Sequence, residues 1–311
     1  MCGIAGFYQS DQNYLSAGYH GTSPENPWRK RLIAMRQSLR SRGPNDENTL
    51  LFHHAGLAHT RLAIRDILGG KQPMSAQYRG RGASIVYNGE IYNTCELREE
   101  LKPFGMSWST TGDTEVILNG FLAMGTSFFE KLNGIFAFAI YVHQTKELYL
   151  VRDSLGVKPL FYSFDHTAVV FGSEPKALFA YGIHPAADRA CWNEIFSLGP
   201  ARTLGNGGFA GIHELLPGEY MHISASGCRH HFFRKLEAVP HHDSYTDTIR
   251  HVRFLLCDSI HRQMVSDIPI CSFLSGGLDS SLVTAICQMY LKKEDAALDT
   301  FSFDFKGNDV N

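Results

Sequence analysis

The chain opens with Met1-Cys2-Gly3-Ile4-Ala5-Gly6-Phe7, which places a cysteine directly after the initiator methionine. Because cysteine is small, we expect Met1 to be removed, which leaves a thiol and a free α-amine on one residue. An α-amine titrates near ~7.7–8.0 and a thiol near ~8.5, so the amine can take the thiol proton directly or through water. The Cys2 thiolate would then attack a carbonyl carbon. Position alone leaves a second interpretation open, a small buried residue at the start of an edge strand.

Further motifs follow this opening in order along the chain. They are Ser41-Arg42-Gly43-Pro44, Arg61-Leu62-Ala63-Ile64-Arg65-Asp66, Asn88-Gly89-Glu90-Ile91-Tyr92-Asn93, Thr111-Gly112-Asp113-Thr114-Glu115, Gly134-Ile135-Phe136-Ala137-Phe138-Ala139, Arg152-Asp153 with Gly156-Val157-Lys158-Pro159-Leu160, and Ser173-Glu174-Pro175-Lys176-Ala177-Leu178. Together with residues 1–7 they resemble the class II glutamine amidotransferases, whose glutaminase domain belongs to the N-terminal-nucleophile hydrolases. The resemblance covers about the first two-thirds of the chain and implies an α+β fold of four layers, αββα.

Amide hydrolysis through a thioester needs an oxyanion hole, and an asparagine side chain beside a glycine backbone N–H supplies two donors aimed at one point. By resemblance, Asn88 and Gly89 are these catalytic donors and Cys2 is the nucleophile. On its own, an Asn-Gly pair is more typical of a type I′ hairpin turn.

Free glutamine carries an α-carboxylate and an α-ammonium group, so its pocket needs a cation and at least one anion. The resemblance implies that Arg61 binds the carboxylate, that Glu90 and Asp113 hold the amino group, and that the backbone of Leu62, Ala63, Ile64 and Arg65 forms the wall. Arg65 stands where the family more often has an apolar residue. Taken singly, Arg61 also fits a surface salt bridge and Asp113 a helix N-cap.

Periodicity predicts mainly short strands up to about residue 233, interleaved with helices. The expected helices are 27–39, 95–104, 114–124 and 175–181, and the expected strands are 84–88, 135–142, 148–153, 160–164 and 168–172. Brief polar connections at 143–146 and 165–167 indicate hairpins. Strands in runs with helices between the runs predict antiparallel sheets covered by helices.

After a polar stretch at 238–244 the pattern changes to a helix at 245–264, an apolar run at 268–274, a Gly-rich turn, a helix at 280–292 and a strand at 300–305. This order is typical of the opening of a parallel α/β domain. Two strands and one crossover helix leave such a sheet uncovered, so we expect the chain to stop inside a domain. The expected boundaries are 1–237 for the glutaminase domain and 238–311 for the incomplete second domain.

The Gly-rich turn, Ser275-Gly276-Gly277-Leu278-Asp279-Ser280-Ser281, lies between an apolar run and a helix, where backbone N–H groups form an anion cradle. It resembles the pyrophosphate loop of N-type ATP pyrophosphatases, whereas a capped Gly-Gly turn is the plainer alternative. The resemblance implies that ATP is a substrate, that Mg2+ is used, and that there is no organic prosthetic group. It assigns pyrophosphate contacts to Ser275, Gly276, Gly277 and Ser280, the metal to Asp279, and adenosine contacts to the backbone of Leu274 and Phe303.

A glutaminase followed by a pyrophosphate loop resembles the glutamine-hydrolysing asparagine synthetases, as does Ser266-Asp267-Ile268-Pro269-Ile270. The implied reaction converts aspartate, glutamine, ATP and water to asparagine, glutamate, AMP and pyrophosphate, with ammonia crossing a protected passage. Because the chain ends before the family's aspartate-recognising segment, we expect a truncated form that keeps mainly the glutaminase half. A stand-alone glutaminase, an amidotransferase for another carboxylate and a non-catalytic regulatory relic stay open. So do a homodimer and a partner that supplies the missing synthetase segment.

The composition narrows the classes of molecule that the protein is expected to bind. The 311 residues carry 29 Lys+Arg against 31 Asp+Glu, a formal charge of −2, which argues against nucleic-acid or anionic-membrane binding. The longest apolar run, 135–142, is far short of the ~20 residues that span a bilayer, so a cytoplasmic location is expected. Seven scattered cysteines without a C-x-x-C pair predict neither a disulfide framework nor a zinc site. Residues 205–210 fit a G-x-G-x-x-A pattern, but we expect no helix after them and hence no nucleotide site.

Overall fold

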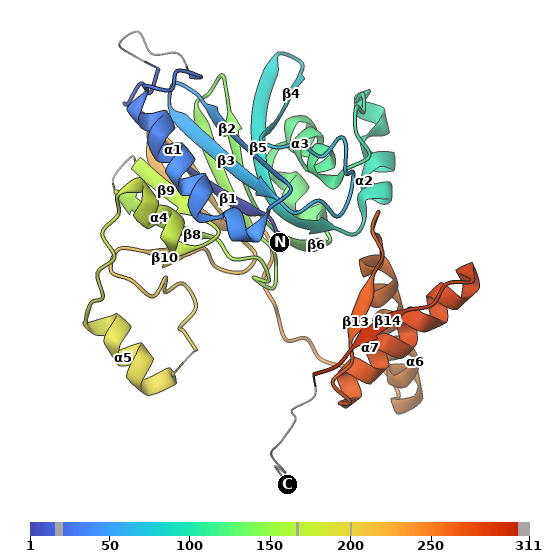
Figure 1. The fold of residues 1–311 in the computed structure, drawn as a ribbon. Coiled ribbons are helices and arrows are strands. Elements are labelled where there is room, and N and C mark those ends of the chain that lie inside the picture. The colour runs from blue at the N-terminus through green and yellow to red at the C-terminus, as the bar shows by residue number, and fades with distance from the viewer. Residues whose placement is uncertain (16–20, 166–167, 200, 304–311) are drawn as a thin grey trace. The chain divides into compact units, whose positions relative to one another are not determined.

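The computed structural model describes residues 1–15, 21–165, 168–199 and 201–303 (Figure 1). The chain divides into two compact units, Met1–Leu236 and Glu237–Asn311, and the break falls one residue before the boundary expected after residue 237. Within the described parts of the chain, no helix is long and apolar enough to cross a membrane.

Within its described residues, the first unit consists of two antiparallel sheets of six strands each. The first sheet has the order β10-β8-β9-β1-β3-β2, with β1 Gly3–Gln9, β2 Asp46–Leu51, β3 Ala55–Arg61, β8 Phe161–Asp165, β9 Ala168–Gly172 and β10 His213–Glu214. The second has the order β12-β11-β7-β6-β5-β4, with β4 Met74–Tyr78, β5 Arg81–Ile91, β6 Gly134–Val142, β7 Glu147–Arg152, β11 Glu219–Ser224 and β12 Gly227–Phe232. The expected hairpins are confirmed as the antiparallel pairs β6–β7 and β8–β9, although residues 166–167 lie outside the described part.

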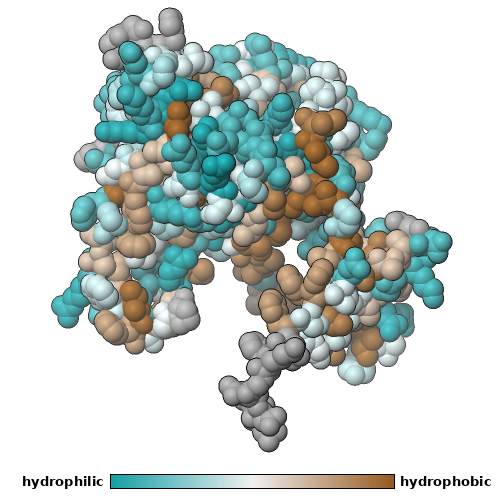
Figure 2. Space-filling model, in the orientation of Figure 1, coloured by the Kyte–Doolittle hydropathy of each residue, from teal (hydrophilic) through white to brown (hydrophobic). Residues whose placement is uncertain are grey.

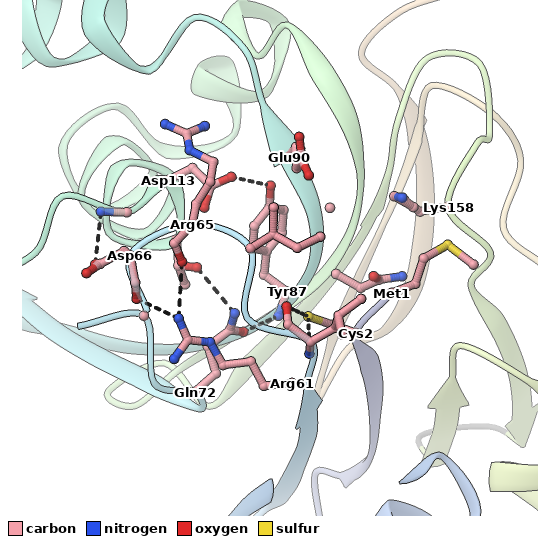
Figure 3. A pocket seen from close by; sticks show the side chains of 17 residues that line it. Met1, Cys2, Arg61, Arg65, Asp66, Gln72, Tyr87, Glu90, Asp113 and Lys158 are labelled. Atoms are coloured by element: carbon pink, nitrogen blue, oxygen red, sulfur yellow. Dashed lines mark hydrogen bonds between the residues drawn. The ribbon is translucent and has the colours of Figure 1, made fainter. Parts of the chain in front are cut away.

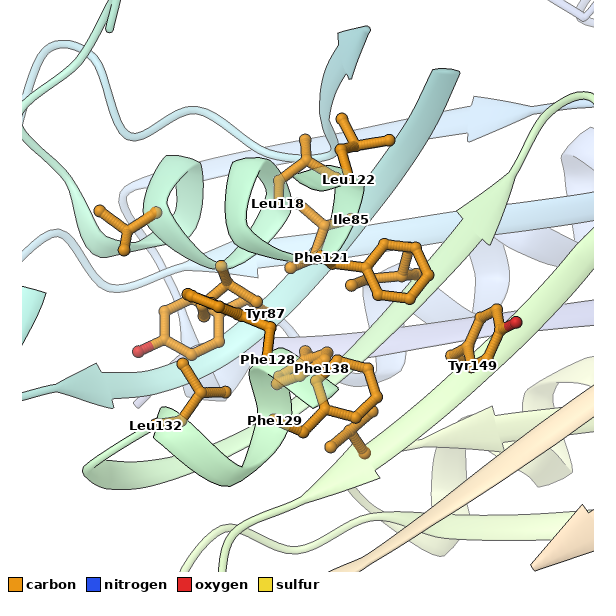
Figure 4. Packing of buried hydrophobic residues seen from close by; sticks show 14 of the residues in the cluster. Ile85, Tyr87, Leu118, Phe121, Leu122, Phe128, Phe129, Leu132, Phe138 and Tyr149 are labelled. Carbon is orange, nitrogen blue, oxygen red and sulfur yellow. The ribbon is translucent and has the colours of Figure 1, made fainter. Parts of the chain in front are cut away.

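Helices cover the outer face of each sheet. On the first sheet, α1 (Pro27–Ser38) and α4 (Pro175–Tyr181) pack against residues of β1 such as Phe7. On the second, α2 (Thr94–Leu101) and α3 (Asp113–Met124) pack against β5 and β6 in a core rich in aromatic rings (Figure 4). A third core lies between the sheets. These three cores separate four layers, so the αββα prediction is confirmed. A fifth helix, α5 (Arg189–Leu198), follows α4.

Strand β6 shows why the central strands are apolar throughout rather than alternating. Successive side chains of a strand point to opposite faces. Phe136 and Phe138 enter the core under α2 and α3, whereas Ala137 and Ala139 enter the core between the sheets. Both faces of β6 are therefore buried, and its small residues lie on the face where two sheets pack together.

Local signals account for helix ends and for the small errors in their expected bounds. Asn26 caps α1, because its Oδ1 accepts hydrogen bonds from the N–H groups of Trp28 at 2.9 Å and Arg29 at 3.3 Å. The helix expected at 95–104 ends as an α-helix at Leu101 and continues as a 3-10 turn, Lys102–Phe104. Pro103 lies in that turn, and a proline lacks the N–H needed to extend an α-helix.

Strand β5 is longer than the expected 84–88, and the difference bears on the site. It runs from Arg81 to Ile91. It pairs antiparallel with β6, from Ala83 opposite Val142 to Ile91 opposite Gly134. Asn88 and Gly89 therefore lie inside a strand, opposite Ala137 and Phe136. The alternative of a type I′ hairpin turn at Asn-Gly is wrong.

The second unit contains α6 (Tyr245–Gln263), β13 (Cys271–Phe273), α7 (Leu278–Leu291) and β14 (Asp299–Phe301). The two strands pair in parallel, which confirms the predicted parallel α/β arrangement. The strand expected at 300–305 is shorter, and residues 304–305 lie outside the described part. Apolar side chains on α6 and α7, including Ile249, Val252 and Leu282, remain 40–50% exposed, and apolar patches lie on the surface of this unit (Figure 2).

His59 makes the first unit sensitive to acid. Its ring lies on β3 and is 1% exposed, and Nε2 bonds to the Tyr87 carbonyl at 3.2 Å. Burial lowers the pKa of His59 to about 4. In the unfolded chain, the pKa of the His59 imidazole is near its ordinary value of ~6.5. The folding stability that depends on a neutral His59 is therefore fully present above that pH and is lost as pH falls toward 4.

We expect the wild type to lose about 2 kcal/mol more unfolding free energy than His59→Gln between about pH 7 and about pH 5. Glutamine keeps a donor for the Tyr87 carbonyl but does not titrate. Denaturant titrations at both pH values measure the difference, and His242→Gln, an exposed histidine, serves as the control. Equal pH dependence in wild type and His59→Gln would contradict the assignment.

Candidate functional site

A cavity opens where the residues just before β1, the end of β3 and the loop after it, the last part of β5 and the start of α3 converge (Figure 3). Its wall is formed by Met1, Cys2, Arg61, Leu62, Ile64, Arg65, Asp66, Gly70, Gln72, Tyr87, Asn88, Gly89, Glu90, Gly112, Asp113, Thr114 and Lys158. Every glutamine-site residue expected from the sequence lines this wall except Ala63, whose N–H donates to Asn45 Oδ1 at 3.0 Å.

The Cys2 thiol lies beside Leu62 at the edge of the cavity. Its Sγ accepts a hydrogen bond from the Leu62 N–H at 3.4 Å and lies 3.7 Å from the Leu62 carbonyl oxygen, to which it can donate. Burial raises the pKa of the Cys2 thiol, and the hydrogen bond to Leu62 opposes that shift. A thiol held in this way needs a base to become a nucleophile. Burial also lowers the pKa of the Met1 amine, which favours a neutral amine at this end of the chain.

Arg42 and Glu174 hold the backbone of Cys2. Arg42 Nε donates to the Cys2 carbonyl at 2.9 Å, and Arg42 Nη1 pairs with Glu174 Oε1 at 2.8 Å. The neighbouring Ser173 Oγ accepts from the Ile4 N–H at 3.0 Å. The motifs at 41–44 and 173–178 were visible in the sequence. The pairing of Arg42 with Glu174 could not be deduced from it, since 132 positions separate the two residues.

Asn88 and Gly89 present unused donors to the cavity. Asn88 is 1% exposed, and among the described residues no group accepts a hydrogen bond from its Nδ2. Alternate N–H groups of a strand point to the same side. On that side the Tyr87 N–H donates to Gln72 Oε1 at 2.6 Å and the Ile91 N–H to Asp113 Oδ2 at 3.1 Å, so the Gly89 N–H between them faces the cavity.

Strand β5 leaves this edge open because its other neighbour stops early. Strand β4 pairs with β5 only as far as Met74 opposite Ile85. Gly89 also has no room for a side chain, since a Cβ there would collide with the Ile135 carbonyl oxygen and with Phe136 Cα. The strand can therefore carry a donor pair at its open edge while remaining paired with β6 on the other.

Arg61 lies inside the cavity wall, with 6% of its surface exposed. It donates to backbone carbonyls of the loop that follows β3: Nη1 to Ile67 at 2.9 Å, and Nη2 to Asp66 at 2.6 Å and Arg65 at 3.1 Å. The alternative of a surface salt bridge is wrong. Arg65 turns the other way and donates to the Ile91 carbonyl at 3.0 Å, so the two arginines tie the loop to β3 and β5.

Two carboxyl groups give the cavity a negative side. Asp113 is 7% exposed and accepts from the Tyr87 hydroxyl at 2.8 Å as well as from Ile91. Gly112, not Asp113, is the N-cap of α3, so the capping alternative is wrong. Burial raises the pKa of Glu90, and the nearby Asp113 charge raises it further. Burial lowers the pKa of Lys158, the cation that faces Glu90 across the cavity (Figure 3).

The Gly-rich turn of the second unit lies between β13 and α7, as expected. Ser275 Oγ and Ser280 Oγ are 2.9 Å apart, and Gly277 is the N-cap of α7. Gly276 has a φ of 83°, and a Cβ added there would meet no described atom within 4 Å. Asp279 lies in the first helical turn. In the described residues, no group of three or more His, Cys, Asp and Glu side chains could hold a metal ion.

The adenosine contacts expected of Leu274 and Phe303 fall at the end of the parallel pair. The Leu274 N–H donates to the Phe301 carbonyl at 2.8 Å, and the Leu274 carbonyl accepts from Ser302 Oγ at 2.6 Å. The Phe303 ring stacks on Phe273 with 6.1 Å between centroids. The G-x-G-x-x-A stretch at 205–210 leads into β10 and not into a helix, as expected.

Comparisons with known proteins agree with the geometry of the first unit. Residues 1–234 match the family model of the glutamine amidotransferase domain. Among solved structures, the glutamine phosphoribosylpyrophosphate amidotransferase from B. subtilis is 14% identical at a TM-score of 0.52, covering 97% of this chain and 65% of that one. A structure described as the allosteric regulatory enzyme of purine biosynthesis has a TM-score of 0.51 at 16% identity, covering 100% and 67%. Residues 1–234 therefore belong to the glutamine amidotransferase domain family and have an N-terminal-nucleophile amidotransferase-like fold.

Residues 251–310 match the asparagine synthase model. The asparagine synthetase [glutamine-hydrolyzing] 3 of Bacillus subtilis is 42% identical over 99% of this chain and 49% of its own length. Asparagine synthetase B of Escherichia coli is 34% identical over 84% of this chain and 42% of its own. The chain belongs to the family of glutamine-hydrolysing asparagine synthetases, and it spans about half the length of these relatives.

Proposed function

We propose that this chain hydrolyses glutamine at Cys2 and is the glutaminase half of a glutamine-dependent asparagine synthesis. The observation that carries the proposal is the unpartnered, buried Asn88 Nδ2 beside the Gly89 N–H, in the same cavity wall as the Cys2 thiol. Two donors for which the described residues offer no acceptor, next to a thiol, suit the oxyanion of a tetrahedral intermediate.

The proposed reaction begins once Met1 is removed. The freed α-amine of Cys2 takes the thiol proton, and Sγ attacks the side-chain amide carbon of glutamine. Negative charge on the amide oxygen is stabilised by Asn88 Nδ2 and the Gly89 N–H. The carbon–nitrogen bond breaks, ammonia leaves with the proton, and the resulting thioester is hydrolysed by water to glutamate.

Charges around the cavity support the choice of glutamine as the substrate. Asp113 and Glu90 lie on one side, where they suit an α-ammonium group. Arg61 and the backbone of the loop at residues 62–65 lie on another, where they suit an α-carboxylate. Because Arg61 already donates to three carbonyls, part of its contribution is to hold this loop in place for the substrate.

For the second unit we propose that the turn from Ser275 to Ser280 binds the phosphates of ATP. Backbone N–H groups at the start of α7 and the two serine hydroxyls suit an anion, and the open space at Gly276 admits one. Asp279 would hold Mg2+, which binds through one or two carboxylates together with phosphate oxygens. The metal would neutralise phosphate charge. Aspartate as the acceptor is proposed from the family alone.

The test is glutamate release from glutamine by the purified 311-residue chain, after mass spectrometry confirms loss of Met1. We expect glutamate with or without ATP and aspartate, and no aspartate-dependent pyrophosphate, because the relatives are about twice as long. A folded and processed chain that releases no glutamate would overturn the glutaminase proposal. Pyrophosphate released with aspartate would show a working synthetase half, and pyrophosphate with another carboxylate would identify a different acceptor.

A further inference from the structure

The loop at residues 62–70, which follows β3, depends on polar contacts for its position. At its outer end Ile67 is 48% exposed and Leu68 is 89% exposed. Segments that bury few apolar side chains are among the least stable parts of a fold. Asp66 precedes these two residues and has a φ of 48°, in the left-handed region that Asp, Asn and Gly tolerate best. The hydrogen bonds of Asp66 therefore bear directly on where this loop lies.

Both carboxyl oxygens of Asp66 accept hydrogen bonds from the backbone. Oδ1 accepts from the Gly69 N–H at 3.0 Å, within the loop, and Oδ2 accepts from the Gly112 N–H at 3.1 Å. Gly112 is the N-cap of α3 and directly precedes Asp113. The Asp66 carbonyl accepts from Arg61 Nη2 at 2.6 Å in the cavity wall (Figure 3). Asp66 thus joins the turn of the loop, Arg61 and the start of α3.

The parts that Asp66 joins are the two halves of the proposed amino-acid site, so the inference rests on the proposed function. The carboxylate half, Arg61 and the loop, is tied to the proposed nucleophile, because the Leu62 N–H donates to Cys2 Sγ at 3.4 Å. The ammonium half is tied to β5, since Asp113 Oδ2 accepts from the Ile91 N–H at 3.1 Å. A substrate held at both halves needs them at a fixed spacing.

We propose that Asp66 sets the spacing between the carboxylate and ammonium halves and so selects substrates that carry both groups. It is a positioning residue, since its oxygens serve the N–H groups of Gly69 and Gly112. Arg65 also bonds the loop to β5, at the Ile91 carbonyl, whereas the Asp66 contact reaches the N-cap of α3. An asparagine in place of Asp66 would present an oxygen to one of the two N–H groups and an NH2 group to the other.

The test compares Asp66→Asn with the wild type in the full chain. It measures KM and kcat for glutamine and the Ki of glutaramate, which is glutamine without its α-amino group, as a competitor. Asparagine keeps the size of the side chain and tolerates a positive φ. We expect KM for glutamine to rise at least about fivefold and kcat to change by less than about threefold. The Ki of glutaramate should change by less than about twofold, because glutaramate engages the carboxylate half alone.

The matched control is Asp188→Asn. Asp188 is an exposed aspartate that also accepts a backbone hydrogen bond, from the Cys191 N–H at 2.9 Å, and it is not in the cavity wall. It should leave KM, kcat and Ki unchanged.

A second variant reaches the same contact from α3. A Cβ added at Gly112, where φ is −73°, would lie 3.1 Å from Asp66 Oδ2, so Gly112→Ala should also raise KM for glutamine and spare the Ki of glutaramate. Because both substitutions act on one contact, we expect the double variant to raise KM by no more than about twofold beyond the larger single effect. Should Asp66→Asn fold poorly, an unchanged KM in Gly112→Ala would still overturn the inference.

The outcomes separate this inference from the glutaminase proposal. If the wild type releases glutamate but Asp66→Asn keeps the wild-type KM, Asp66 does not set the spacing and the glutaminase proposal stands. The same conclusion follows if glutamine and glutaramate are weakened equally, or if the two substitutions multiply in the double variant. If the folded and processed wild type releases no glutamate, the glutaminase proposal is overturned and this inference with it.

Discussion

Replacement of Cys2 by alanine is expected to lower glutamine hydrolysis by at least about 10⁴-fold while leaving the fold intact. Alanine keeps the α-amine, the oxyanion donors and the substrate contacts but removes the atom that attacks the amide carbon. Loss of Sγ costs the structure little, because its contacts are weak ones to Leu62 at 3.4 and 3.7 Å. Glutamate release under saturating glutamine measures the effect.

The matched control is Cys95→Ala, which removes an exposed thiol on α2 that is not in the cavity wall. It should hydrolyse glutamine at the wild-type rate, and both variants should show the wild-type circular dichroism spectrum. If Cys2→Ala kept more than a trace of glutamine hydrolysis, the assignment of Cys2 as the nucleophile would be wrong, whatever the behaviour of the control.

Replacement of Asn88 by alanine is expected to lower kcat by about 10²–10³-fold and to change KM by less than about threefold. Among the described residues, nothing accepts a hydrogen bond from Asn88 Nδ2. This donor can therefore bond to the amide oxygen of glutamine as negative charge develops on it during the reaction. Steady-state kinetics at several glutamine concentrations separate the two constants.

Asn48→Ala is the control for Asn88→Ala, since Asn48 is an exposed asparagine on β2 whose side chain donates to the nearby Asp46. It should leave both constants unchanged. If Asn88→Ala instead raised KM at constant kcat, the amide would bind the ground state of the substrate and the oxyanion role would be wrong.

Much of the fold was predictable from local patterns. The helices and strands that were expected in the first unit appeared near their predicted positions, because apolar periodicity and caps such as Asn26 act within a few residues. The sequence predicted no ranges for β1–β4, β10–β12 and α5, and for β5 it predicted only the part at 84–88. The alternative of a hairpin turn at Asn88-Gly89 was wrong for a clear reason. Dipeptide statistics favour a turn there, but pairing of Gly89 with Phe136 extends β5 through it, and that pairing depends on a strand far along the chain.

The sequence by itself pointed to Cys2 as the proposed nucleophile, and its ordered motifs carried the resemblance that implied the layered architecture, because such motifs are encoded within short stretches. Only the tertiary structure decided what surrounds that nucleophile. The Arg42 contact with the Cys2 carbonyl and the open edge of β5 at Gly89 each depend on register or on contacts between separate elements. Such contacts are set by how whole sheets and loops pack together, which no local pattern records.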